Sequence, residues 1–204
     1  MQSVAHARGV AVTTPLAATH LNGGDVEMAI EKQYKGRERF GGSKLVTLPD
    51  GTTLSVGDLN TFNGTTMLPW HLRRYTKCLR LSINELVLLE SFIIRQWEED
   101  KSVWLSMEKW GRQLGVHRTT LMRARDKLEA KGYIEPMGMR QFGIAEYQVT
   151  GALLAMSLCV MCDPSGTFAK EQGYCVTEAQ AHAQMAEWGY WFDLDFEALA
   201  KLGP

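Results

Sequence analysis

Residues 104–134 read WLSMEKWGRQLGVHRTTLMRARDKLEAKGYI and predict two helices joined by a tight glycine turn. Ser106 is expected to cap the first helix, because its hydroxyl can accept a hydrogen bond from a first-turn amide. Three apolar side chains recur at helical spacing and form its expected buried stripe: Met107, Trp110 and Leu114. Gly111 lacks a side chain, so another helix can approach closely there. Gly115 tolerates the positive φ that ends a helix and turns the chain sharply.

The second helix is expected to run from Arg118 to Lys131 and to end at Gly132. Its apolar face is narrow and comprises Leu121, either Ala124 or the stem of Arg125, and Leu128. The opposite face is basic and polar, with Arg118, Thr119, Met122, Arg123 and Lys127. Proteins place a helix in the DNA major groove by this combination of a helix, a tight turn and a basic helix. We therefore predict that this face binds DNA, with His117 and Thr120 contacting a base or a phosphate at the helix start.

A helix before this stretch and a strand pair after it complete the expected unit. Ser82 and Glu85 form a capping box, in which each side chain bonds the other residue's amide. The helix that follows is the expected support, with a wide apolar face: Leu86, Val87, Leu89, Ile93, Ile94 and Trp97. Short strands are expected at Val103–Leu105, Tyr133–Met137 and Ile144–Thr150. The link at 138–143 is the expected wing, with Arg140 at its tip for a phosphate or minor-groove contact.

The chain resembles bacterial winged helix-turn-helix DNA-binding proteins, above all the type found in plasmid and phage replication initiators. The resemblance begins at LSINELVLLESFI (Leu81–Ile93), includes the glycine turn and the ending LEAKGYI, and covers roughly residues 70–150. It implies an α+β fold, mainly α with a small β-wing, and sequence-specific binding to double-stranded DNA in the bacterial cytoplasm or nucleoid. Such proteins often carry a small hydroxyl residue at the start of the recognition helix, where this chain has His117.

Three functions are compatible with these features. The first is a replication initiator, which binds origin repeats and positions other replication proteins. The second is a winged-helix transcription regulator, with the same DNA chemistry and a contact to RNA polymerase. The third is a protein-interaction module that keeps the winged-helix fold. Basic charge favours the two DNA-binding functions, and only the resemblance favours replication over transcription.

The charge of the chain is unevenly distributed, although its formal net charge is only −1. Residues 1–69 hold six Lys or Arg and six Asp or Glu, residues 70–140 hold 14 and nine, and residues 141–204 hold two and eight. Basic charge therefore lies on the segment with the glycine turn, and the acidic segment after it discourages indiscriminate phosphate binding. The stretch HLRRYTKCLR (His71–Arg80) is either a solvated connector or a set of phosphate contacts. The expected backbone contacts are Arg73, Arg74, Lys77, Arg80, Ser106 and Arg140.

Composition divides the chain into four segments. Residues 1–43 lack sustained periodicity and are expected to form a flexible arm, with a short helix at Asp25–Tyr34 as the alternative. Residues 44–65 alternate around the turn Pro49-Asp50-Gly51 and predict a β-hairpin that must pack on another part of the protein or on a partner. Residues 66–150 are the expected DNA-binding domain, and residues 151–204 the expected helical appendage.

The appendage is expected to start with a helix, capped by Thr150, that is apolar on nearly all sides. Because a small domain cannot cover such a helix, we predict a homodimer through Ala152–Met161, with Leu158 facing outward. Two further helices are expected, one capped by Thr177 with Gln180 in a capping box and one capped by Asp195. The aromatic residues between them form either a core or a protein-contact patch: Trp188, Tyr190, Trp191 and Phe192.

No pattern for catalysis or for a cofactor is present in the sequence. Cys159, Cys162, Cys175 and His182 suggest a zinc site, but no second close pair follows the first two thiols, which favours buried core thiols. The sequence lacks a Walker-type phosphate loop and the histidine cluster of a nickase. We therefore expect no enzyme activity, no metal and no cofactor. Four cysteines fit a reducing cytoplasm, and no apolar run approaches the ~20 residues of a membrane helix.

Overall fold

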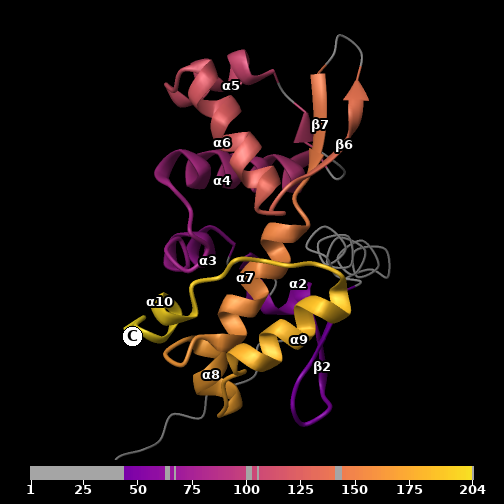
Figure 1. The fold of residues 1–204 in the computed structure, drawn as a ribbon, viewed down its shortest axis with the longest axis vertical. Coiled ribbons are helices and arrows are strands. Elements are labelled where there is room, and N and C mark those ends of the chain that lie inside the picture. The colour runs from indigo at the N-terminus through magenta and orange to yellow at the C-terminus, as the bar shows by residue number, and fades with distance from the viewer. Residues whose placement is uncertain are drawn as a thin grey trace, which may run out of the picture.

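The computed structural model describes residues 44–62, 65–66, 68–99, 103–104, 106–140 and 144–203. This part of the chain is mainly helical with three small antiparallel sheets, as expected for an α+β protein. The expected arm at 1–43, with its alternative helix, and residues 141–143 of the expected wing lie outside the described residues. Figure 1 shows two stacked units that meet where the chain passes from β7 (Ile144–Gln148) into α7 (Gly151–Cys162).

The upper unit in Figure 1 comprises three helices and a three-stranded sheet, and we call it the α4–β7 unit (residues 83–148). Its elements before β7 are α4 (Ile83–Glu99), β5 (Val103–Trp104), α5 (Met107–Leu114), α6 (Arg118–Ala130) and β6 (Glu135–Arg140). The strands lie in the order β5-β7-β6, so β5 adds to the outer edge of the β6–β7 hairpin. The expected order of three helices and three strands is confirmed.

Strand β6 begins and ends later than expected. Tyr133 and Ile134 form a bend, because Gly132 turns the chain with a φ of 70° and the Tyr133 hydroxyl donates to Leu79 O (2.9 Å). The strand then continues through Arg140, so residues 138–140 belong to the hairpin and not to the link. The prediction of a strand at Tyr133–Met137 is therefore wrong by two to three residues at each end.

The buried face of the support helix α4 agrees only in part with the expected one, since Leu89 and Ile93 are buried as expected. Its buried apolar residues are Leu88, Leu89, Phe92 and Ile93. Ile94 is 47% exposed, so its assignment to the buried face is wrong. The ring of Phe92 lies 4.9 Å from that of Trp110 on α5 and 5.8 Å from that of Tyr147 on β7. The buried face of α4 therefore includes Phe92 and leaves out Ile94.

The lower unit in Figure 1 is built around α7 from both ends of the described chain, and we call it the α7-centred unit. Before the α4–β7 unit the chain supplies β1 (Leu45–Thr47), β2 (Thr53–Ser55), α2 (Val56–Leu59), β3 (Thr61–Phe62), β4 (Thr65–Thr66) and α3 (Leu68–Arg74). After α7 it supplies α8 (Thr167–Gln172), α9 (Glu178–Trp188) and α10 (Phe196–Ala200). The capping box that starts α9 and the Asp195 cap of α10 are confirmed.

Every residue of α7 is buried within the chain. Helices α2, α3, α8 and α9 pack around it, and Figure 1 shows it running through the middle of the lower unit. Leu158 is 0% exposed, so the prediction that it faces outward is wrong. Leu158 is buried because α2 and α3, which lie within residues 44–74 of the same chain, pack against α7. The homodimer stays a prediction, with α7 excluded as its interface. Thr150 also forms no side-chain cap, contrary to expectation.

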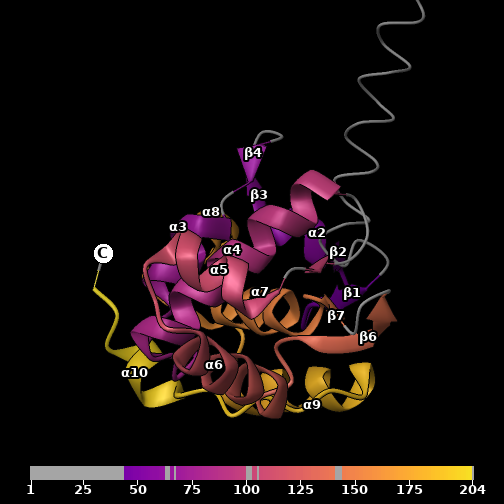
Figure 2. The same cartoon turned by 90° about the horizontal axis from the view of Figure 1, so that it is seen from above.

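The two units meet at the end of α6 and the beginning of α7. Ala152 N donates to Tyr133 O (3.1 Å). The backbones approach so closely that a Cβ on Gly151 would lie 1.7 Å from Gly132 O, which only glycine permits. This contact holds the C-terminal end of α6 against the α7-centred unit. The N-terminal end of α6 therefore lies with α5 at the free end of the molecule (Figure 1), and Figure 2 shows α5 from above, in front of α7.

Candidate nucleic-acid interface

The turn between α5 and α6 is built by local contacts that were expected from the sequence. The Ser106 hydroxyl accepts from Lys109 N (3.2 Å) and caps α5. Gly115 ends α5 with a φ of 65°, and Val116 N donates back to Gly111 O (3.0 Å). A Cβ on Gly111 would lie 2.6 Å from Val116 O, so the missing side chain lets the turn fold onto α5. The predicted helix cap at Ser106 and the predicted turn at Gly115 are therefore confirmed.

His117 is the N-cap of α6. Its ring Nδ1 accepts from Thr119 N (3.3 Å), and Thr119 Oγ1 lies 2.5 Å from the same nitrogen. The imidazole thus takes the place of the small hydroxyl or carboxylate side chains that usually cap helices. Both side chains stay exposed at the start of α6.

The N-terminal half of α6 carries the basic surface of this helix. Leu121, Ala124 and Leu128 are buried, as expected. Among the predicted contacts, Arg118, Thr119, Arg123 and Lys127 are exposed, whereas Thr120 and Met122 are half-buried. Asp126 and Glu129 are also exposed and make the C-terminal half more acidic. A DNA backbone is therefore expected to favour the first two turns of α6, from His117 to Arg123.

Helix α5 adds two exposed cations and one exposed amide that were not predicted from the sequence. Lys109, Arg112 and Gln113 are exposed on the helix that packs against the start of α6. Arg112 lies 4.0 Å from Glu108, a distance at the limit of an ion pair. The available signal was the position of Arg112 two residues after the buried Trp110, which places it on the opposite side of the helix.

The basic stretch before α4 divides into residues with different roles. Arg74 is bonded within the protein, which argues against a DNA contact: its Nε donates to Asp163 (2.8 Å) and its Nη2 to Ser165 (2.8 Å) and Gly203 O (3.2 Å). Asp163 is 0% exposed. Burial raises the pKa of its carboxyl, but the bonds from Arg74 and Ser165 outweigh burial and hold that pKa below its ordinary value. Arg74 therefore neutralises a buried acid at the end of α7.

The other three cations of this stretch remain accessible. Arg73 pairs with Glu90 (3.0 Å) while its side chain stays 70% exposed, and Arg80 pairs with Asp193 (2.9 Å). Lys77 is exposed. Surface pairs of this kind break at little cost, so phosphate contacts by these residues stay a prediction.

The β6–β7 hairpin projects toward the same end of the molecule as α5 (Figure 1). Met137 and Met139 on β6 are 56% and 75% exposed. The side chain of Arg140 lies outside the described residues, and so its contact with DNA stays a prediction.

Glu85 on α4 forms an ion pair with Lys131 at the C-terminal end of α6. Its carboxylate is buried and accepts from Ser82 N (3.0 Å) and from Lys131 Nζ (2.6 Å), with Lys127 Nζ at 3.9 Å. Burial raises the pKa of Glu85, but the bonds from Lys131 and Ser82 outweigh burial, so its pKa lies below the ordinary value. Lys127 approaches this carboxylate only at the limit of an ion pair, and its side chain stays 67% exposed.

Replacing Glu85 with Gln is expected to lower the free energy of unfolding by about 1.5–3 kcal/mol at pH 7, the usual contribution of a hydrogen bond to a charged group. A carboxyl with a lowered pKa stabilises the folded state above its ordinary pKa, and this contribution is lost as pH falls through the folded value. The difference between wild type and Glu85→Gln should therefore shrink below about pH 4.5, which urea unfolding at several pH values measures. Glu90→Gln, which removes only a surface pair, is the control and should cost at most about 1 kcal/mol. An equal effect of both variants contradicts the prediction.

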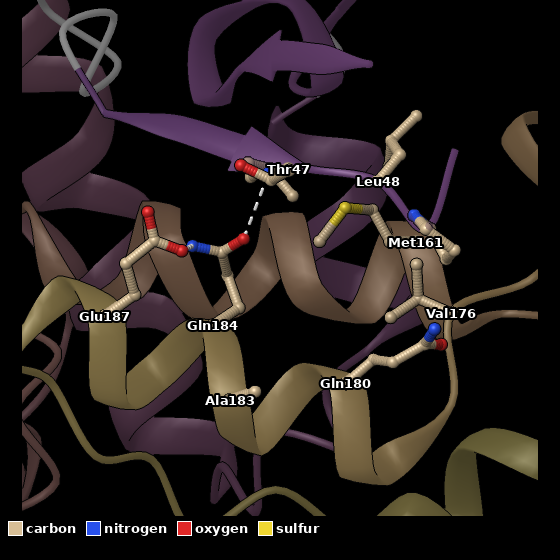
Figure 3. A pocket seen from close by; sticks show the side chains of 10 residues that line it. Thr47, Leu48, Met161, Val176, Gln180, Ala183, Gln184 and Glu187 are labelled. Atoms are coloured by element: carbon tan, nitrogen blue, oxygen red, sulfur yellow. Dashed lines mark hydrogen bonds between the residues drawn. The ribbon is translucent and has the colours of Figure 1, made fainter. Parts of the chain in front are cut away.

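A hollow of about 200 Å³ lies between the β1–β2 hairpin and α9 (Figure 3). Its wall is mainly apolar, with Val46, Leu48, Met161 and Val176. The amide of Gln184 spans it, accepting from Thr47 N (3.1 Å) and donating to Glu187 (2.9 Å). Trp188 Nε1 adds a bond to Leu45 O (3.0 Å). The bonds from Thr47 to Gln184 and from Trp188 to Leu45 attach the β1–β2 hairpin to α9.

The cysteines and histidine that suggested zinc do not converge. Cys159 and Cys162 are buried in α7, and Cys175 Sγ donates to Met161 O (3.3 Å). The ring of His182 lies between those of Trp191 (5.0 Å) and Phe196 (5.3 Å). In the part of the chain that the structure describes, no three His, Cys, Asp or Glu side chains are placed to hold a metal ion.

Comparisons of the chain with protein-family models, curated proteins and solved structures found no match. Among the described helices, none is both long and apolar enough to cross a membrane. The α5–α6 surface thus remains the candidate site, on the basis of its geometry and charge.

Proposed function

We propose that this protein binds double-stranded DNA in a sequence-specific way, and that its α4–β7 unit is a winged helix-turn-helix. Two features support the fold: the order helix, strand, helix, helix, strand, strand, and the sheet order β5-β7-β6. In this proposal α6 is the recognition helix, α5 crosses the DNA backbone and the β6–β7 hairpin is the wing. The resemblance to replication initiators extends the proposal to origin binding, with transcription regulation as the alternative.

The observation that carries the proposal is the distribution of unpaired cations. Among the described residues, no ion pair neutralises Arg118 or Arg123 on α6 or Lys109 on α5. Most arginines elsewhere in the described chain are paired, including Arg73, Arg74, Arg80 and Arg125. Exposed cations without a protein partner are free to bind phosphates and base edges.

Replacing Arg123 with Ala is expected to cost about 1–3 kcal/mol of binding free energy on the preferred site and to relax sequence preference at one position. Arginine reads guanine through two hydrogen bonds, which alanine cannot form. The preferred site is first selected from a random duplex library, and affinities are then measured by fluorescence anisotropy. Lys170→Ala, which removes an exposed cation of α8, is the control and should change neither quantity. Equal losses of affinity on selected and random DNA would mean that Arg123 contacts a phosphate and does not read a base.

The position of the bound sites in the source genome separates the two DNA-binding roles. Clustered repeats at an origin are expected for a replication initiator, and single sites at promoters for a transcription regulator. A protein-interaction module binds no duplex at all, so the library selection also tests that third role.

A further inference from the structure

The aromatic residues near the end of α9 differ in their surroundings. Trp188 and Phe192 are buried, and the Tyr190 hydroxyl donates to the carboxylate of Glu135 on β6. Trp191 is 66% exposed. Three of these four aromatic side chains therefore hold the fold together, and Trp191 is the one that presents its ring to solvent.

The Trp191 ring is held in place by two neighbouring rings. Its centroid lies 5.0 Å from that of His182 on α9, with 36° between the ring planes, and His182 packs edge-on against Phe196 of α10 (5.3 Å). We call Trp191, His182 and Phe196 the Trp191 patch. Exposed and buried residues alternate along 191–194, as in an extended strand, so Trp191 and Asp193 share the outer face of this segment.

Trp70 on α3 shows a second exposed tryptophan with a different environment. It is 46% exposed, and the guanidinium of Arg74 lies 5.2 Å from its ring centroid. Within the described residues, no lysine or arginine lies over the Trp191 ring. The negative face of an aromatic ring attracts a cation, and tryptophan does so most strongly. The Trp191 ring is therefore an unoccupied acceptor for a cation.

The surface around the Trp191 patch is acidic, and residues 141–204 hold only two Lys or Arg against eight Asp or Glu. Four acidic side chains lie on or beside the elements that carry the patch: Glu178, Asp193, Asp195 and Glu197. Asp193 pairs with Arg80 and Glu197 with Lys201. In the described part of the chain, neither Glu178 nor Asp195 has an ion pair. This charge attracts a cation and repels a phosphate.

We propose that the Trp191 patch binds an arginine of a partner protein, with the guanidinium stacked on the exposed indole and bonded to the neighbouring carboxylates. Arginine fits better than lysine, because its planar guanidinium stacks on aromatic rings and can bind a carboxylate through two hydrogen bonds. The patch belongs to the α7-centred unit, whereas α5 and the start of α6 lie in the α4–β7 unit (Figure 1). The inference therefore goes beyond the proposed DNA binding and does not rest on it.

The probe is a peptide of alternating arginine and glycine with uncharged ends. In ¹⁵N-labelled protein, the indole N–H signal that is missing from Trp191→Leu identifies Trp191, and we expect this signal to shift as the peptide is added. The same peptide with citrulline, a neutral isostere, in place of each arginine should leave the signal unmoved. By fluorescence anisotropy, Trp191→Leu should bind the arginine peptide about three- to tenfold more weakly than wild type, as expected for the loss of one cation–π contact. Ile83→Ala removes a 69% exposed apolar side chain from α4 and is the matched control, which should bind like wild type.

Three results would overturn the proposal. An equal shift of the Trp191 signal with the citrulline peptide would mean that the ring does not recognise a cation. Wild-type affinity of Trp191→Leu for the arginine peptide would mean that the peptide responds only to net charge. A wild-type protein that sediments as a dimer, with Trp191→Leu as a monomer, would mean that a second copy covers the patch. These measurements contain no duplex, so their outcome is independent of DNA binding.

Discussion

Replacing Arg74 with Ala is expected to lower the free energy of unfolding by about 3–5 kcal/mol, the usual cost of leaving a buried charge without its partner. The carboxylate of Asp163 is fully buried and receives bonds from Arg74 (2.8 Å) and from the Tyr75 hydroxyl (3.1 Å). Without the guanidinium, that carboxylate must stay charged in an apolar site or take up a proton. Urea unfolding at neutral pH measures the loss.

Two comparisons make this prediction specific. Arg73→Ala removes a neighbouring arginine whose side chain is 70% exposed, and should cost at most about 1 kcal/mol. Adding Asp163→Ala to Arg74→Ala should recover part of the stability, because the unpaired charge is then gone. An Arg74→Ala protein as stable as Arg73→Ala, but weaker on DNA, would restore Arg74 as a phosphate contact and contradict the buried pair.

Leu158→Glu is expected to prevent stable folding. Leu158 lies on α7 with 0% exposure, and a carboxylate there must be desolvated without a partner. The expected cost exceeds about 4 kcal/mol, which is a large part of the stability of an ordinary domain. Circular dichroism during heating should show a lost or strongly lowered transition, and size-exclusion chromatography should show expanded or aggregated protein.

Trp191→Glu is the matched control, because Trp191 is 66% exposed and its replacement should leave the protein folded. A Leu158→Glu protein that elutes as a compact monomer with the wild-type melting temperature would mean that α7 has an accessible face. In that case α7 would again be a candidate for the dimer interface.

The parts of the fold that the sequence predicted are those decided by neighbouring residues. The caps at Ser106, Thr177 and Asp195 and the turn at Gly115 depend on side chains and φ angles within a few positions. The order of three helices and three strands follows from the same local signals. These features placed α6 and its basic face correctly.

The errors arise where distant segments meet. The sequence of α7, apolar on nearly all sides, indicates that the helix is covered, but not whether a second subunit or residues 44–74 of the same chain cover it. In the same way, a run of arginines did not reveal that Arg74 reaches Asp163, 89 positions away. Only the tertiary fold separates a phosphate contact from a structural ion pair in such a stretch.

The candidate site was predicted in outline and not in detail. Exposure of Arg118 and Arg123 follows from helical periodicity. The contribution of Lys109 on α5 was missed, because it depends on how α5 packs against the start of α6. The approach of Lys127 to Glu85 (3.9 Å) depends on the packing of α6 against α4.

The most direct test of DNA reading by α6 is the affinity of Arg118→Ala/Arg123→Ala for the selected duplex at one fixed salt concentration. Lys170→Ala/Lys201→Ala has the same net charge and removes two exposed cations from the α7-centred unit. We expect the α6 variant to bind at least about 30-fold more weakly than wild type, since each arginine contributes about 1–3 kcal/mol, and the control to bind like wild type. Wild-type affinity of the α6 variant, or an equal loss in both, would contradict the proposed role of α6.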